Sequence, residues 1–171
     1  MKYCDWKDFY GDTEEVIPPN APKPRGKDID LRAKVDSDHA GDKETRKSRT
    51  GYLIFWNITL VDWLYKKQPT IETSVFGAEF VALKHVMEDL RGINYKLWMM
   101  GVTLSSCYYV YGDNMSVIHR NQRPESTLRN KSNSICYYTV CESVEMGDTK
   151  TAHISTHDNL SELLTKVLYG A

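Results

Sequence analysis

The sequence predicts an α/β fold in which a five-stranded mixed sheet is flanked by helices. Two observations lead to this fold class. Three β-rich segments follow one another in the first half of the chain, and helical and β-rich segments alternate after them. A chain of 171 residues, 41% hydrophobic and 26% charged, has the size and apolar content of one ordinary domain.

Residues 1–30 are expected to form a connector, the tail of a preceding region. Prolines cluster there, Pro18, Pro19 and Pro22 among them, and the segment shows neither helical nor alternating periodicity. The pattern changes at Leu31, where apolar and polar side chains begin to alternate. The domain itself is therefore expected to comprise residues 31–171.

Three predicted strands open the domain. Residues 31–36 alternate between apolar and polar side chains, which predicts a half-buried strand that ends in an acidic turn at residues 36–38. Residues 51–56 and 60–65 are rich in β-branched and aromatic side chains, so we expect an antiparallel pair with a tight turn at Asn57. The aromatic side chains expected in the core are Trp56, Trp63, Tyr108 and Tyr109.

The second half of the chain is expected to alternate between helices and strands. Apolar residues at helical spacing predict a long helix over residues 75–98. A short apolar run at residues 107–111 predicts a buried strand, and Asp113 or Asn114 is expected to cap the short helix that follows. The remaining predictions are a helix over 132–145, a strand over 150–155, and a terminal helix from Asp158 or Asn159 to Leu168, with Leu160, Leu163, Leu164 and Val167 facing inward.

Glu79 is the most informative residue of the long helix. It shares the apolar stripe with Phe76, Leu83 and Val86, so its carboxylate is expected to face the core. A buried ionised carboxylate is costly unless a cation or hydrogen-bond donors compensate it. The alternative is that Glu79 lies at the edge of the stripe and reaches solvent or a lysine.

Two aspartates follow strands that we expect to be neighbours. Asp36 ends the first strand and Asp113 ends the fourth, so both side chains can meet Glu79 at one end of the sheet. Clustered carboxylates need positive charge among them, and hard oxygen ligands select Mg²⁺ or Mn²⁺. Two such ions, sharing Asp36, suit phosphodiester hydrolysis. Taken singly, an aspartate is more often a turn or capping residue, which is the interpretation for Asp38, Asp42 and Asp158.

Four segments carry a resemblance to a known family. They are VDSDHAGDKETRKSRTGYLIF, WLYKKQPTIETSVFGAEFVAL, YGDNMSVI and DNLSELLTK, within Leu31 to Leu168. With these segments the chain resembles the ribonuclease H domain that follows reverse transcriptase in copia-type retrotransposon Pol polyproteins. The resemblance implies a ribonuclease H-like fold, cleavage of the RNA strand of an RNA/DNA hybrid, two Mg²⁺ ions replaceable by Mn²⁺, and a reverse-transcriptase domain as partner.

The resemblance also implies which acids bind metal. They fall on Asp36, Glu79 and Asp113, and the fourth position falls on Glu162, where the family has aspartate. The longer side chain of Glu162 can displace its carboxylate by more than a catalytic site tolerates. A second departure is Lys131-Ser132, where many relatives carry a Lys-His pair.

Candidate substrate contacts lie in two basic segments, although the net charge of −1 gives no sign of a nucleic-acid partner. Each segment has four cations against one glutamate, a local excess of +3, and either can follow a phosphate backbone or be a solvated loop. Ser37, Gln68 and Asn114 are candidates for contacts to 2′-hydroxyls. His157 is a candidate proton shuttle, with an exposed loop histidine as the alternative. The basic residues are Lys43, Arg46, Lys47 and Arg49, then Arg120, Arg123, Arg129 and Lys131.

Three functional hypotheses follow. The first is the hybrid-specific endonuclease, and the second is a catalytically silent, decayed or repurposed retroelement domain that binds nucleic acid or is only structural. An integrase-like strand transferase ranks last, because it needs a zinc-binding or DNA-end-binding region that the sequence lacks. Four cysteines without a Cys-x-x-Cys pair favour a reducing intracellular location, and no apolar run suggests a membrane role. The resemblance implies that this location is cytoplasmic, in a virus-like particle, or nuclear.

Overall fold

A computed structural model describes residues 29–102, 104, 107–122 and 134–166 of the chain. Its centre is a five-stranded mixed sheet in the order β3-β2-β1-β4-β5. The first three strands form an antiparallel meander, while β4 runs parallel to β1 and β5 runs parallel to β4. The strands are β1 (Leu31–Asp38), β2 (Arg49–Trp56), β3 (Thr59–Lys67), β4 (Tyr108–Gly112) and β5 (Thr149–His153). The predicted fold class is confirmed.

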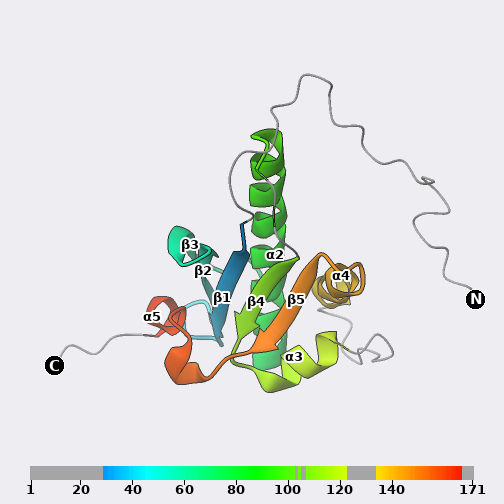
Figure 1. The fold of residues 1–171 in the computed structure, drawn as a ribbon. Helices are drawn as coiled ribbons and strands as arrows, with labels where there is room; N and C mark the ends of the chain where they lie inside the picture. Colours follow the sequence, from blue (N-terminus) through cyan, green and yellow to red (C-terminus); the bar gives the residue numbers. More distant parts are fainter. Residues whose placement is uncertain (1–28, 103, 105–106, 123–133, 167–171) are drawn as a thin grey trace, which may run out of the picture.

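The long helix α2 (Val75–Met99) covers one face of the sheet, and Figure 1 shows it running behind β1 and β4. It begins at Ser74, whose hydroxyl accepts a hydrogen bond from the amide of Gly77 at 3.1 Å. The helices α3 (Met115–Asn121) and α4 (Ser134–Glu145) pack against α2 and β5. Among the described residues no helix is both long and apolar enough to cross a membrane.

The core lies between α2 and the inner face of the sheet. Leu31, Ala33 and Val35 of β1 are buried against the apolar stripe of α2, which includes Phe80 and Leu83. Each large apolar side chain buried in this way contributes about 1.5–3 kcal/mol relative to exposure. The alternation predicted for β1 and the helical stripe predicted for α2 are thus confirmed, and together they fix how β1 and α2 approach each other.

The C-terminal part differs from the prediction. Instead of one helix to Leu168, the chain forms a 3₁₀ turn η2 (Thr156–Asp158) and a single α-helical turn α5 (Glu162–Thr165). Leu160 and Leu163, predicted to face inward, are exposed. The buried side chains are polar: the Asn159 amide donates to the carbonyl of Val35 at 3.0 Å, and the Ser161 hydroxyl donates to Asn159 at 2.6 Å. Hydrogen bonds therefore hold this segment where an apolar stripe was expected.

The expectation that Trp63 belongs to the core is wrong, because its exposed fraction is 63%. It lies on β3, the edge strand of the sheet, and no element of the described chain covers that strand. Tyr108 is buried in β4 as predicted, while Trp56 and Tyr109 are half-buried. Of the predicted connector, only Ile29 and Asp30 belong to the described residues, and Val167 and Leu168 lie outside them.

Candidate metal centre

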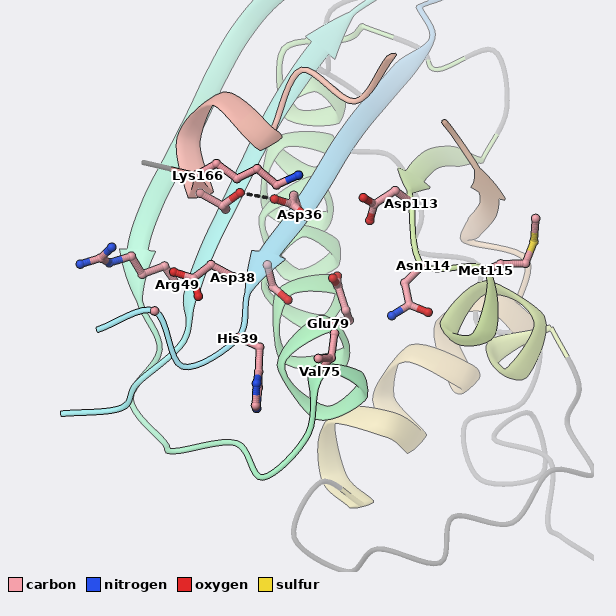
Figure 2. A pocket seen from close by; sticks show the side chains of 13 residues that line it. Asp36, Asp38, His39, Arg49, Val75, Glu79, Asp113, Asn114, Met115 and Lys166 are labelled. Atoms are coloured by element: carbon pink, nitrogen blue, oxygen red, sulfur yellow. Dashed lines mark hydrogen bonds between the residues drawn. The ribbon is translucent and has the colours of Figure 1, made fainter. Parts of the chain in front are cut away.

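Three carboxylates meet at one end of the sheet. Asp36 is near the end of β1, Glu79 is in the second turn of α2, and Asp113 follows β4 directly. The parallel β1–β4 pair places Lys34 opposite Tyr111, so Asp36 and Asp113, each two residues further on, reach the same edge. One carboxylate oxygen from each of the three residues lies within 4.8 Å of the other two. Figure 2 shows them pointing into an open cleft of about 840 Å³.

Glu79 is buried in the structure, with an exposed fraction of 6%. The pKa of its carboxyl is raised from 4.5 to about 8. Burial is the main cause, and the neighbouring carboxylates of Asp36 and Asp113 add to the rise. Polar contacts from Ser37 oppose the rise. A carboxyl in this setting favours its neutral form at pH 7 unless a cation compensates the charge. The three carboxylates of Asp36, Glu79 and Asp113 therefore form a donor set that fits a hard divalent cation.

Asp36 is held by the C-terminal segment. The buried hydroxyl of Thr165 donates a hydrogen bond to its Oδ2 atom. Burial raises the pKa of the Asp36 carboxyl above its usual value, and Asp113 and Glu162 add to the rise, while Thr165 and Lys166 oppose it. Because Thr165 belongs to α5, this contact attaches α5 to the carboxylate group from the face of the sheet opposite α2.

Asp113 is more open than the other two carboxylates. Its Oδ2 accepts a hydrogen bond from the Thr156 hydroxyl at 3.1 Å, and its backbone carbonyl lies 3.1 Å from Nε2 of His153. The next residue, Asn114, lines the cleft and caps α3 by accepting from the amide of Val117 at 3.3 Å. Of the two residues predicted to cap α3, Asn114 is the one that does so, and the Asp113 carboxylate is left directed at the cleft.

The structure does not bring Glu162 into this group. Its carboxylate pairs with the ammonium of Lys166, one helical turn further on, and Glu162 is not among the residues that line the cleft. Lys166 does line it, and the pKa of its ammonium is raised by Glu162 above all and also by Asp36 and Asp113. At this position of the cleft the lining residue is therefore Lys166, and the role of Glu162 as a fourth metal ligand stays a prediction.

The predicted basic contacts divide into three groups. Arg49 lines the cleft, and its guanidinium carbon lies 5.9 Å from the ring centroid of Tyr65. Lys43, Arg46 and Lys47 follow β1 in the loop to β2 and do not line the cleft, and the guanidinium of Arg120 lies over the Phe76 ring, at 5.5 Å from its centroid. Arg123, Arg129 and Lys131 lie outside the described residues, as does Ser132.

Gln68 is not a surface contact, contrary to the prediction. Its exposed fraction is 1%, and its amide nitrogen donates to the Thr50 hydroxyl at 3.0 Å and to the Ala78 carbonyl at 2.9 Å. It ties the end of β3 to β2 and α2 inside the protein. Ser37 is also buried, beside Glu79, whereas His157 is exposed in η2, next to the threonine that contacts Asp113.

Sequence reasoning did not identify Thr165 or Lys166. Thr165 lies three residues and Lys166 four residues after Glu162, a spacing that puts side chains on one face of a helical turn. This spacing was the sequence signal that could have identified them. Asp38, interpreted as a turn residue, ends β1 and lines the cleft. Gly41 allows the chain to return past it, because a Cβ there would lie 1.8 Å from Asp38 Oδ2.

The fold is that of ribonuclease H domains. A ribonuclease H1 isolated from compost, LC11-RNase H1, superposes with a TM-score of 0.61 at 16% identity, covering 79% of this chain and 91% of that one. The same enzyme in complex with an RNA/DNA hybrid gives a TM-score of 0.60 at 14% identity, covering 78% and 92%. A foamy viral protease-reverse transcriptase, also solved with an RNA/DNA hybrid, gives 0.52 at 12% identity, covering 94% of this chain and 25% of that one.

The chain is homologous to a segment of the retrovirus-related Pol polyproteins of transposons. It is 30% identical over 144 residues to the polyprotein of transposon RE1 from Arabidopsis thaliana, covering 84% of this chain, and 31% identical over 143 residues to that of transposon TNT 1-94 from Nicotiana tabacum, again covering 84%. It spans only 10% and 11% of those two polyproteins. No family model matches the chain. The resemblance seen in the sequence is confirmed.

Proposed function

We propose that this chain is a metal-dependent endonuclease of the ribonuclease H type, which hydrolyses the RNA strand of RNA/DNA hybrids during reverse transcription of a retroelement. The observation that carries the proposal is the approach of Asp36, Glu79 and Asp113 to within 4.8 Å of one another beside an open cleft of this fold. The substrate class is supported by the similar enzyme that was solved with a bound hybrid.

The three carboxylates would hold the divalent cation, Mg²⁺ or Mn²⁺. When bound, such an ion supplies positive charge that stabilises a phosphodiester under attack by water. The protein's own residues prepare the site. Thr165 orients Asp36 and Thr156 orients Asp113, while Glu79 is held on α2 with most of its side chain buried. The cleft leaves the opposite side of the carboxylates open to a strand of nucleic acid.

The proposed activity belongs to a longer protein. Because the chain spans about a tenth of its curated relatives, we infer that it works beside a reverse-transcriptase domain of the same polyprotein. The foamy viral protease-reverse transcriptase supports this arrangement, since this fold covers a quarter of that chain.

The test is cleavage of a labelled RNA/DNA hybrid in Mg²⁺ or Mn²⁺, beside RNA/RNA and DNA/DNA duplexes. We expect cutting of the hybrid alone, and we expect Asp113→Asn to lose at least about a hundredfold in rate while keeping its fold, because one of three charges that hold the cation is removed. Asp62→Asn is the matched control, since Asp62 lies on the edge strand β3 and does not line the cleft.

The second candidate is a domain that keeps the fold without the chemistry. The observation that favours it is the position of Glu162, which pairs with Lys166 and stays out of the carboxylate group. Folded protein that binds no Mn²⁺ in a calorimetric titration and cuts none of the three duplexes would establish this second candidate.

A further inference from the structure

One cationic side chain reaches the carboxylate group from the short helix α5. Lys166 follows that helix, lines the cleft, and pairs through its ammonium with Glu162. Figure 2 shows its side chain extending from α5 across Asp36 in the direction of Asp113. The exposed fraction of the side chain is 60%, so the ammonium remains open to the cleft.

The short helix α5, which precedes Lys166, packs closely on the sheet. Gly51 of β2 has no side chain, and a Cβ there would lie 2.8 Å from Cγ2 of Thr165 and 2.9 Å from Cβ of Leu164. The helical turn therefore rests directly on the sheet at this glycine. Together with the Thr165–Asp36 hydrogen bond, this contact holds α5 on the sheet, so that Lys166 follows directly beside the carboxylates.

Few cationic side chains are available in the cleft to contact the phosphates of a bound strand beyond those at the metal centre. Of the described lysines and arginines, only Arg49 and Lys166 line it. Arg49 lies over the Tyr65 ring, and its guanidinium is directed away from Glu79 and Asp113 in Figure 2. An ammonium has three N–H donors, and its bond to Glu162 uses one of them.

We propose that Lys166 is a substrate-binding residue, whose ammonium donates to a phosphate oxygen of the bound strand, and that Glu162 is its anchor and not a fourth metal ligand. The inference rests on the proposed function, because the strand is the substrate of that reaction. It assigns a role to Glu162: its side chain reaches along the helical turn to Lys166.

The test measures binding separately from cleavage. Hybrid affinity is determined by fluorescence anisotropy in Mg²⁺ with the Asp113→Asn variant as parent, across a series of salt concentrations. Adding Lys166→Met is expected to weaken binding about tenfold and to reduce the slope of log K against log salt by about 0.9, the value for one phosphate contact. Lys166→Arg, which keeps the charge, is expected to retain the slope.

Lys84→Met is the matched control. Lys84 forms the same kind of one-turn ion pair, with Glu88 at 2.7 Å, but on the part of α2 that does not line the cleft. It should leave both affinity and slope unchanged. Glu162→Gln in the otherwise unaltered protein should leave Mn²⁺ affinity, measured by calorimetry, within about threefold, whereas loss of a metal ligand weakens it by tenfold or more.

An unchanged salt slope for Lys166→Met overturns the inference, and so does a large loss of Mn²⁺ affinity for Glu162→Gln. If the original protein cuts hybrids and Lys166→Met binds them like its parent, only this inference fails. If hybrids bind through Lys166 and the original protein cuts none, only the proposed function fails. A parent that binds no hybrid at all refutes both.

Discussion

Replacing Glu79 by glutamine should make the protein more stable at pH 8 in the absence of divalent cations. The substitution keeps the shape of the side chain but removes its ability to ionise. Burial, with help from Asp36 and Asp113, raises the pKa of Glu79 from 4.5 to about 8. The folded protein therefore binds a proton that the unfolded chain has already released, over the range between these two values.

The sign and the size follow from this difference. Because the folded state holds more protons between pH 4.5 and about 8, the free energy of unfolding falls as pH rises through that window and levels off above it. At about 1.4 kcal/mol per pH unit the upper bound is about 5 kcal/mol. We expect about half of this bound, because the open cleft beside Glu79 screens part of the charge.

Urea unfolding followed by circular dichroism, in EDTA and at pH values from about 5 to 9, measures the effect. The gap between Glu79→Gln and the original protein should widen up to about pH 8 and then stay constant. Glu88→Gln, on the same helix but half-exposed, should follow the original profile. Parallel profiles for Glu79→Gln and the original protein, or a less stable variant at pH 8, would refute the reasoning.

Two further substitutions test how the site is supported. Thr165→Val removes the hydroxyl that donates to Asp36, so we expect a loss of about 1–3 kcal/mol in unfolding free energy and weaker Mn²⁺ binding in calorimetry; unchanged values for both would contradict the assigned role. Gln68→Ala leaves the Thr50 hydroxyl and the Ala78 carbonyl without their donor and opens a small cavity, so urea unfolding should show a loss of about 2 kcal/mol. Hybrid affinity should not change, and a reduced affinity in the folded variant would restore Gln68 as a substrate contact.

The sequence was sufficient for the central sheet and the long helix because their periods are set by burial on one side. In β1 the apolar side chains of Leu31, Ala33 and Val35 all face α2, and the α2 stripe from Phe80 to Leu90 faces back. Both patterns extend over enough residues to exclude the other type of structure. The parallel placement of β4 beside β1 then brings Asp36 and Asp113 together. This meeting could be predicted from the order of the strands and helices along the chain.

The same reasoning failed where position in the fold overrides local pattern. Trp63 has the character of a core residue, but its strand is at the edge of the sheet, and strand order depends on pairings that the sequence of one strand does not contain. Gln68 looked like a surface residue because it is polar, yet its amide nitrogen has two specific partners inside the protein, Thr50 and Ala78. Neither outcome is encoded in periodicity.

Glu162 shows why an acid can be located by motif and still not be assigned by it. The motif places Glu162 on the helical turn beside Asp36. In the structure its negative charge helps to raise the pKa of the Asp36 carboxyl. Whether its oxygen reaches a metal depends on about one methylene of length and on what else competes for it. Lys166 directly follows the same helical turn, and its ammonium pairs with this carboxylate. The four-residue spacing between Glu162 and Lys166 therefore bears on the role of this carboxylate as much as the identity of the residue does.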